Sequence, residues 1–297
     1  MLYKDFKISI KSLGFLSIED FMRYIGVTSS DVLEWEEKDE VPNTVSLIVH
    51  LLKGEGELPN NTALDSVVEE RLPLTSLLEE MFLLQKQLND STNGKNWELG
   101  VNKFGKEINW LRCIHMEVAE LIDSAPWKHW KNIAADPDMN NVHVELVDIW
   151  HFLMSYILQE TNVPKGVSLV NTHCIYEAVE NVDVKLMIKE SEKLSYIALA
   201  IQTGNMPSFS VIERFIDQFF RTCKISGLSF TWLQKLYIGK NCLNKFRQDN
   251  GYKEGTYIKE WNGREDNVVM IEIIETMENV SFDILDAELT KAYSKCK

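Results

Sequence analysis

Two pairs of acidic residues stand out because each pair lies inside an otherwise apolar stretch of the chain. Glu117 and Glu120 are three positions apart, and Glu145 and Asp148 repeat this spacing. Residues three apart lie one above the other on the same face of an α-helix. Carboxylates on the buried side of a helix are costly unless a positive group meets them. The spacing therefore indicates a cation between two neighbouring helices.

The chemistry of these four side chains favours a hard divalent cation. Oxygen-only ligands suit Mg²⁺, which prefers a few carboxylates together with waters and phosphate oxygens. Two or more such ions could hold a triphosphate and ionise a water for attack on phosphorus. A single pair of this kind is usually a solvated helix face, so it is the occurrence of two successive pairs that favours a metal site.

The segment between the acidic pairs interleaves aromatic and cationic side chains. It contains, in order, Trp127, Lys128, His129, Trp130 and Lys131. Aromatic faces can stack on a nucleobase, and lysine can meet phosphate as a point charge. The alternative is that the two tryptophans only pack the end of a helix.

A basic island lies further along the chain. The chain has a formal net charge of −14, yet six cations fall close together at Lys240, Lys245, Arg247, Lys253, Lys259 and Arg264. Glycines at positions 251, 255 and 263 permit tight turns, and Tyr252 and Tyr257 add hydroxyl donors. This stretch could neutralise phosphate charge that the metal ions leave over, or it could be a solvated basic loop.

Helices must position these groups. Helical periodicity extends over 107–123, 143–160, 173–201, 209–223 and 230–248, and a capping-box spacing at Ser76 opens a further helix. No clear β alternation occurs apart from a short piece within 250–262. The sequence thus predicts an all-α helical bundle over residues 73–297, a linker over 59–72 and a small helical domain over 1–58.

Residues 1–58 resemble the helix-turn-helix of phage-repressor-like DNA-binding domains, with a turn at Gly26, Val27 and Thr28. The stretch from 28 to 40, where such a fold places its recognition helix, holds six carboxylates and one lysine. Duplex binding rests on several cationic contacts to phosphate. We therefore expect this module to contact protein, and DNA binding, which would make the chain a bifunctional regulator, is the alternative.

Composition sets the remaining expectations. The five cysteines are scattered and contain no CxxC pair, so they predict neither a disulfide framework nor a zinc site and favour a reducing cytoplasm. No stretch approaches the roughly 18 apolar residues of a membrane span, and we expect no membrane partner. An acidic surface also repels nucleic acid.

Taken in order, the stretches 83–89, 117–124, 145–152 and 239–267 resemble the dimeric all-α dUTPases, which are relatives of the MazG-type pyrophosphohydrolases. The resemblance covers roughly residues 76–290. It implies the helical fold of all-α NTP pyrophosphohydrolases, Mg²⁺-dependent hydrolysis of dUTP and dUDP to dUMP, and a homodimer with its interface in 160–235. A broader MazG-like dNTP pyrophosphohydrolase is the alternative.

The resemblance also implies roles for individual residues. The four acidic residues would ligate Mg²⁺, with Glu117 or Glu120 helping to deprotonate the attacking water. The uracil contacts would be Gln85, Asn89, His129 and Asn244, with Trp127 offering a stacking face. Phe152 would pack on the deoxyribose. The phosphate contacts would be Arg247, Tyr252 and Lys259, with Lys240, Lys253 and Asn267 nearby. Two departures are that residues 1–72 are an addition, and that His129 stands where some members carry tryptophan.

Overall fold

The computed structural model describes residues 2–12, 18, 39, 41, 45, 49, 62–131, 135–206 and 211–296, and the side chains of 62–73 are outside this description. The chain divides into two compact units, Met1–Leu77 and Leu78–Lys297. In the first unit, helix α1 (Tyr3–Ser12) buries Phe6 and Ile10. The predicted helix-turn-helix falls almost entirely outside the described residues.

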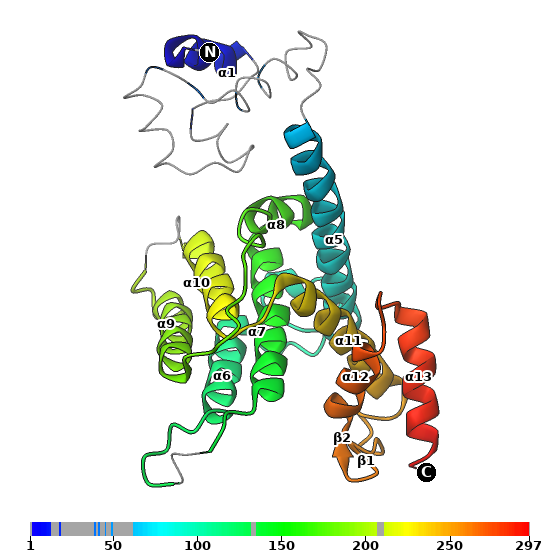
Figure 1. Cartoon of the computed structure of the whole chain (residues 1–297). Coiled ribbons are helices and arrows are strands. Elements are labelled where there is room, and N and C mark those ends of the chain that lie inside the picture. The colour runs from blue at the N-terminus through cyan, green and yellow to red at the C-terminus, as the bar shows by residue number, and fades with distance from the viewer. Residues whose placement is uncertain are drawn as a thin grey trace. The chain divides into compact units, whose positions relative to one another are not determined.

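The described residues of the second unit form helices joined by loops, with one short hairpin and one isolated β-bridge, which confirms the predicted all-α fold class (Figure 1). The helices are α5 (Thr62–Asn93), the 3₁₀ turn η1 (Trp97–Leu99), α6 (Trp110–Asp123), α7 (Met139–Glu160), α8 (Val163–Val170), α9 (Val184–Gln202), α10 (Val211–Ile225), α11 (Phe230–Asp249), α12 (Asp266–Glu275) and α13 (Phe282–Ser294). Strands β1 (Glu260–Trp261) and β2 (Arg264–Glu265) pair antiparallel.

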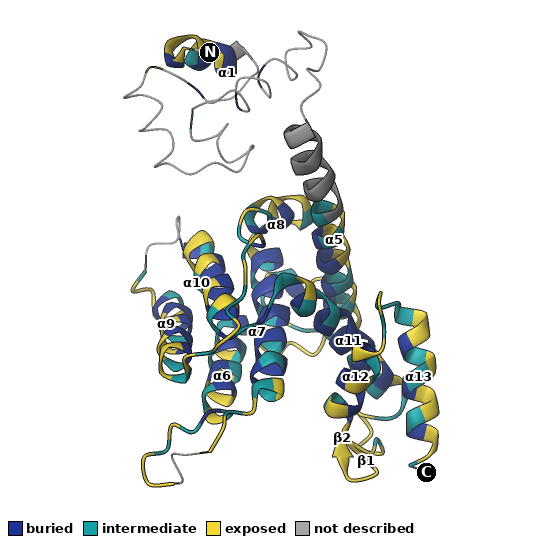
Figure 2. Ribbon diagram, in the orientation of Figure 1, coloured by how far each residue is buried: buried dark blue, intermediate teal, exposed yellow. Residues whose placement is uncertain are grey.

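Helix α7 is the centre of the bundle because it packs against α6, α8, α10 and α11. Most of its side chains are buried, as the dark blue ribbon of Figure 2 shows. Side-chain caps fix where the site-bearing helices begin: Asn109 accepts a hydrogen bond from the amide of Arg112 in α6, and Asp138 accepts one from the amide of Asn141 in α7. None of the described helices combines the length and the apolar character needed to cross a bilayer.

Three parts of the helix prediction differ from the structure. The helix predicted over 173–201 was wrong for its first residues, since α9 begins only at Val184, where the Asp183 side chain caps two amides. Helix α5 begins at Thr62, inside the expected linker, and continues through Pro73. Helices α8, α12 and α13 are not among the predicted helices. Strand β1 lies at the end of the stretch 250–262, where a short β piece is expected, and β2 lies just beyond it.

Gly239 lets α12 approach α11 closely. A Cβ built at this position would lie 2.2 Å from Cδ1 of Ile274 and 3.1 Å from the Met270 sulfur, and both of these side chains are fully buried. Gly239→Ala is therefore expected to destabilise the fold by about 1–3 kcal/mol, even though alanine is the better helix former. Thermal unfolding of the variant measures this loss. A gain in stability would show that α12 shifts without cost.

Candidate active site

Three of the four predicted carboxylates converge on one point. Glu117 on α6 and Glu145 and Asp148 on α7 each offer an oxygen, and these oxygens all lie within 4.8 Å of one another. The arrangement follows from the packing of α6 on α7, with Glu145 and Asp148 on one face of α7. Such a set of oxygens is the donor type that Mg²⁺ prefers. We call these three residues the acidic cluster.

Glu120, the fourth predicted carboxylate, lies one turn beyond Glu117 on α6. Its side chain is exposed and is not part of the acidic cluster. Its charge nevertheless contributes to raising the pKa of both Glu117 and Glu145. Glu120 therefore stands at the open side of the cluster.

Burial and mutual repulsion keep the acidic cluster from ionising fully by itself. Burial, followed by the charges of Asp148 and Glu120, raises the pKa of Glu117 to about 7. Burial, followed by the charges of Asp148 and Glu117, raises the pKa of Glu145 to about 8. A hydrogen bond of 3.1 Å from the Asn141 amide to Glu145 Oε1 orients that carboxyl group. These pKa directions are those expected where like charges await a cation.

A lysine from α11 meets this cluster. Lys240 is only 4% exposed, and its Nζ lies 2.8 Å from Asp148 Oδ2 and 3.3 Å from Asn267 Oδ1. The family resemblance implies that Lys240 and Asn267 lie near phosphate; Lys240 contacts the acidic cluster, and Asn267 is bonded to Lys240.

Arg247 is held by a buried aspartate at the start of α12. Its Nε and Nη2 donate to the two oxygens of Asp266 at 2.8 Å each, and Asp266 is fully buried. The Tyr257 hydroxyl donates to Asp266 Oδ2 at 2.7 Å, and the Asn267 amide donates to Oδ1 at 2.9 Å. The Arg247 guanidinium contributes most to lowering the pKa of Asp266 against its burial. This bidentate pair holds the Arg247 guanidinium in a fixed orientation.

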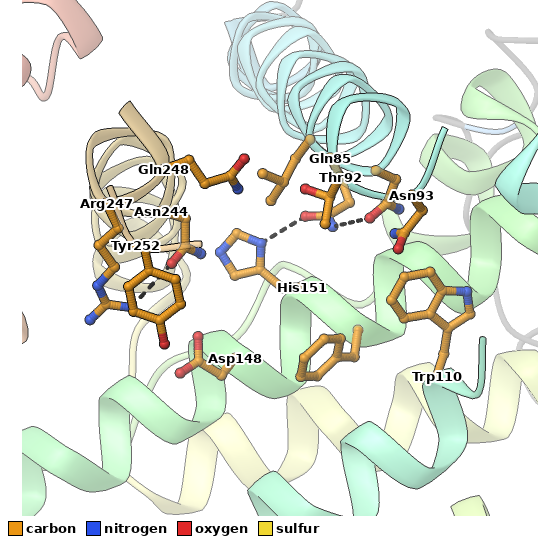
Figure 3. Close-up of a pocket in the computed structure, with 13 residues that line it drawn as sticks. Gln85, Thr92, Asn93, Trp110, Asp148, His151, Asn244, Arg247, Gln248 and Tyr252 are labelled. Carbon is orange, nitrogen blue, oxygen red and sulfur yellow. Dashed lines mark hydrogen bonds between the residues drawn. The ribbon is translucent and has the colours of Figure 1, made fainter. Parts of the chain in front are cut away.

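A pocket of about 380 Å³ opens beside Asp148, between α5, α7 and α11 (Figure 3). Six predicted substrate residues line it, namely Gln85, Asn89, Phe152, Asn244, Arg247 and Tyr252. The other lining residues are Leu88, Thr92, Asn93, Trp110, Asp148, His151 and Gln248. The pocket therefore brings amide side chains, aromatic faces, a cation and one cluster carboxylate together.

A buried hydrogen-bond network orients the amide side chains. Gln85 Nε2 donates to Ser155 Oγ at 2.9 Å, and Asn89 Nδ2 donates to the same oxygen at 2.9 Å. Gln85 Oε1 accepts from the Tyr237 hydroxyl at 3.3 Å and lies 2.7 Å from His151 Nδ1. Since this amide oxygen can only accept, His151 Nδ1 must carry the proton.

His151 thereby presents its other nitrogen as an acceptor. Burial lowers the pKa of His151 to about 4, so the ring is neutral. Its Nε2 is buried and has no hydrogen-bond partner within the described chain. Figure 3 shows the ring between Gln85 and Asn244. A buried acceptor without a partner at a pocket wall is suited to a ligand N–H.

Phe152 forms the apolar wall of the pocket. Its ring stacks on Trp110, with 6.0 Å between the centroids and 28° between the planes. Trp110 in turn meets the fully buried Trp97 edge to face at 5.8 Å. The stack supports Phe152 from behind and limits its movement.

Six predicted substrate residues do not line this pocket: Lys240 and Asn267 lie on the side of the acidic cluster, and the other four lie apart from both. Trp127 lines a different pocket, which it shares with residues of the α9 N-terminus, including Val184 and Lys185. His129 is exposed and contacts the Trp130 ring, and Lys253 and Lys259 are exposed. Lys259 faces Glu265 at 3.7 Å.

The sequence does not point to four of the residues that orient the others, namely Tyr237, His151, Ser155 and Asp266, whereas Tyr257 is expected as a hydroxyl donor and does donate to Asp266. Two of them carried a usable signal. His151 follows Asp148 by three positions on α7, which is the same spacing as in the acidic pairs. Asp266 directly precedes Asn267, for which the family resemblance implies a place near the phosphates. The others are recognised only once α5, α7 and α11 are packed together.

The raised pKa values of the acidic cluster predict a pH-dependent stability in the absence of metal. Unfolded glutamates ionise near a pKa of about 4.3, whereas folded Glu117 and Glu145 hold their protons to about 7 and 8. Between these values the folded chain binds more protons than the unfolded chain, so stability in EDTA falls as the pH rises. A loss of about 2 kcal/mol would lower the melting temperature by roughly 4–8 °C.

Differential scanning fluorimetry across this pH window in EDTA measures that slope. Glu145→Gln should reduce the slope, because the glutamine cannot ionise, and Glu117 should account for what remains. An equal slope in the variant and the unaltered chain would show that other groups cause it.

Comparison with known proteins agrees with the geometry. A family model described as dUTPase matches residues 77–252, which is more than half of the 297-residue chain and includes the acidic cluster and all of the lining residues of the pocket beside Asp148. No protein of curated function matches the chain. The matched region carries the helices that hold the carboxylates, the amide side chains and the cations, and the chain therefore belongs to the dUTPase family.

Proposed function

We propose that this protein hydrolyses dUTP, and also dUDP, to dUMP with the help of Mg²⁺. One observation carries the proposal: Asp148 belongs both to the acidic cluster and to the wall of the amide-lined pocket. A nucleoside in the pocket would therefore extend its phosphates toward the cluster, with Arg247 at the same end. Membership of the dUTPase family supports the choice of substrate.

The oxygens of the acidic cluster suit Mg²⁺, and we propose Glu117, Glu145 and Asp148 as its ligands, with Glu120 as the fourth carboxylate at the open side. The negative charge of these four carboxylates would suit two or more Mg²⁺ ions. Bound Mg²⁺ would neutralise phosphate charge and acidify a bound water. The protein's own contribution is to hold the carboxylates on two packed helices, so that little reorganisation is needed. A carboxylate of the first pair would help to deprotonate the attacking water.

The pocket polar groups suit the edge of uracil. That edge presents one imide N–H between two carbonyl oxygens. Among the described residues His151 Nε2 has no hydrogen-bond partner and can accept, the carboxamides of Asn89 and Asn244 provide donors, and Gln85 orients His151. Cytosine has no such N–H group, so it would leave a buried acceptor unpaired, which costs about 1–3 kcal/mol. This supports discrimination against dCTP.

Phe152 is placed to distinguish deoxyribose from ribose. Replacing Phe152 with Ala should raise hydrolysis of UTP relative to dUTP, because a ring that leaves no polar partner for a 2′-hydroxyl is removed. It should also cost about 3 kcal/mol of stability, since the stack on Trp110 is lost. The ratio of kcat/KM for UTP and dUTP measures the effect. An unchanged ratio would make Phe152 a packing residue only.

We also propose a homodimer, with an interface within 160–235. Its support is an exposed apolar strip on α9, where Tyr196 is 62% and Leu199 is 39% exposed. Light scattering should give twice the chain mass of 34.4 kDa. A monomeric mass at micromolar concentration would remove this part of the proposal.

A nucleotide panel with Mg²⁺ tests the substrate. We expect dUTP and dUDP to react, and dTTP, dCTP and UTP to react at least about tenfold more slowly, which corresponds to 1.4 kcal/mol of discrimination. Similar rates for all deoxynucleotides would favour a broader MazG-like dNTP pyrophosphohydrolase instead.

A further inference from the structure

The ammonium group of Lys240 lies where a divalent cation would be expected to bind. Lys240 Nζ is 2.8 Å from Asp148 Oδ2, and Asp148 supplies one of the three oxygens of the acidic cluster. The lysine side chain is 5% exposed and that of Asp148 is 23% exposed, so water screens the pair poorly. Within the described chain, no other Lys or Arg forms an ion pair with the cluster.

A second contact ties the same ammonium to the phosphate side of the site. Lys240 Nζ is 3.3 Å from Asn267 Oδ1, and the same oxygen accepts from Arg247 Nη2 at 3.3 Å. Arg247 lines the pocket together with Asp148. Lys240 therefore lies at the boundary between the acidic cluster and the end of the pocket that would receive phosphates.

We propose that Lys240 is an internal counter-cation that competes with the divalent metal for Asp148 and, once displaced, turns toward the phosphates of the nucleotide. This inference rests on the proposed function. The inference adds a coupling between metal binding and nucleotide binding. The metal would release the lysine that contacts the nucleotide phosphates, so the metal and the nucleotide would each strengthen the binding of the other.

The charges of the site support this exchange. Without the lysine, three mutually repelling carboxylates would share a largely buried site, which is costly. With both the lysine and a divalent cation at the same carboxylate oxygens, the two positive charges would repel each other. The flexible stem of lysine allows its compact ammonium to turn, while Asn267 Oδ1 is already within its reach. The ammonium charge also lowers the pKa of both Glu117 and Glu145, against the effect of burial.

Metal binding without nucleotide provides the test. Isothermal titration with Mn²⁺ of the full chain and of Lys240→Met should show tighter binding to the variant by about tenfold or more, equivalent to 1.4 kcal/mol. The matched control is Lys245→Met on the same helix, where an exposed lysine pairs with Asp249 and Mn²⁺ affinity should not change.

The coupling gives a second readout. Saturating Mn²⁺ should increase the affinity of the unaltered chain for a non-hydrolysable dUTP analogue, and this increase should shrink in Lys240→Met. An unchanged or weaker Mn²⁺ affinity of the variant would overturn the inference while leaving the metal site intact. Absence of Mn²⁺ binding to either protein would overturn both the inference and the proposed metal site.

The unaltered chain allows a test that does not depend on the folding of a variant. A crystal structure with Mn²⁺ and no nucleotide should show Lys240 Nζ beyond hydrogen-bonding distance of Asp148. An ammonium still bonded to Asp148 beside the metal would contradict the exchange.

Discussion

Asp148→Asn should lower the turnover of dUTP by about 1,000-fold or more, because it removes the charge of a proposed metal ligand that the acidic cluster shares with the pocket. Metal assistance supplies several kcal/mol of charge stabilisation, and each 1.36 kcal/mol corresponds to tenfold in rate. The substitution keeps the size of the side chain, so the bundle should still fold. Steady-state hydrolysis of dUTP at saturating Mg²⁺ measures the loss.

The matched control for this variant lies on the same helix. Glu160→Gln removes one negative charge at the exposed end of α7, away from the acidic cluster, and should leave turnover near its normal value. Near-normal dUTP turnover by Asp148→Asn would show that the acidic cluster takes no part in the reaction. Glu120→Gln tests the exposed carboxylate. Since Glu120 is proposed as the fourth metal ligand, this variant should also lose most of its dUTP turnover.

Arg247→Met should cost about 3–5 kcal/mol of stability, since it leaves a fully buried aspartate without its partner. On a bundle of this size the melting temperature should fall by roughly 10 °C. Binding of dUTP should weaken as well, because the pocket loses its cation. Thermal unfolding and nucleotide titration separate the two effects.

Two comparisons isolate the buried pair. Arg264→Met breaks an exposed pair with Glu272, in which both side chains are about half exposed, and should change stability by no more than about 1 kcal/mol. The double variant Arg247→Met with Asp266→Leu should recover much of the stability without recovering binding, because an apolar pair replaces the buried charges. If Arg247→Met is as stable as Arg264→Met, the buried pair does not stabilise α12.

The acidic cluster could be predicted from sequence because its signal is local. Glu145 and Asp148 lie three residues apart on one helix, and the apolar neighbours that mark their burial are adjacent in the chain. The all-α fold was predictable for the same reason. The break at 171–183 was not, since this stretch is moderately apolar and only the Asp183 cap marks the start of α9.

The orientation of the side chains that line the pocket depends on contacts between segments distant in the chain, and sequence periodicity does not encode these contacts. Gln85 and His151 are 66 residues apart in the chain, and Tyr237 reaches Gln85 from 152 residues away. The same limitation applies to Trp127 and His129. Their position next to the first acidic pair suggested a base contact, yet the turn after α6 directs them away from the pocket.

The C-terminal segment beyond residue 252 lies outside the region that the family model matches, yet it contributes to the site. It supplies Tyr257, Asp266 and Asn267, which fix Arg247 and Lys240 from outside the matched region. The cations of the site are therefore held by the start of α12, with Tyr257 supporting Asp266, while the carboxylates are held by α6 and α7. Coupling between metal and nucleotide would pass between these two groups of helices.

Product analysis by ³¹P NMR tests the central claim most directly. The chain should convert dUTP to dUMP and pyrophosphate, and dUDP to dUMP and phosphate, in Mg²⁺ but not in EDTA. Both reactions should stop in Asp148→Asn. Hydrolysis that continues in EDTA, release of phosphate with dUDP as the product of dUTP, or failure to hydrolyse dUDP while dUTP reacts would contradict the proposed mechanism.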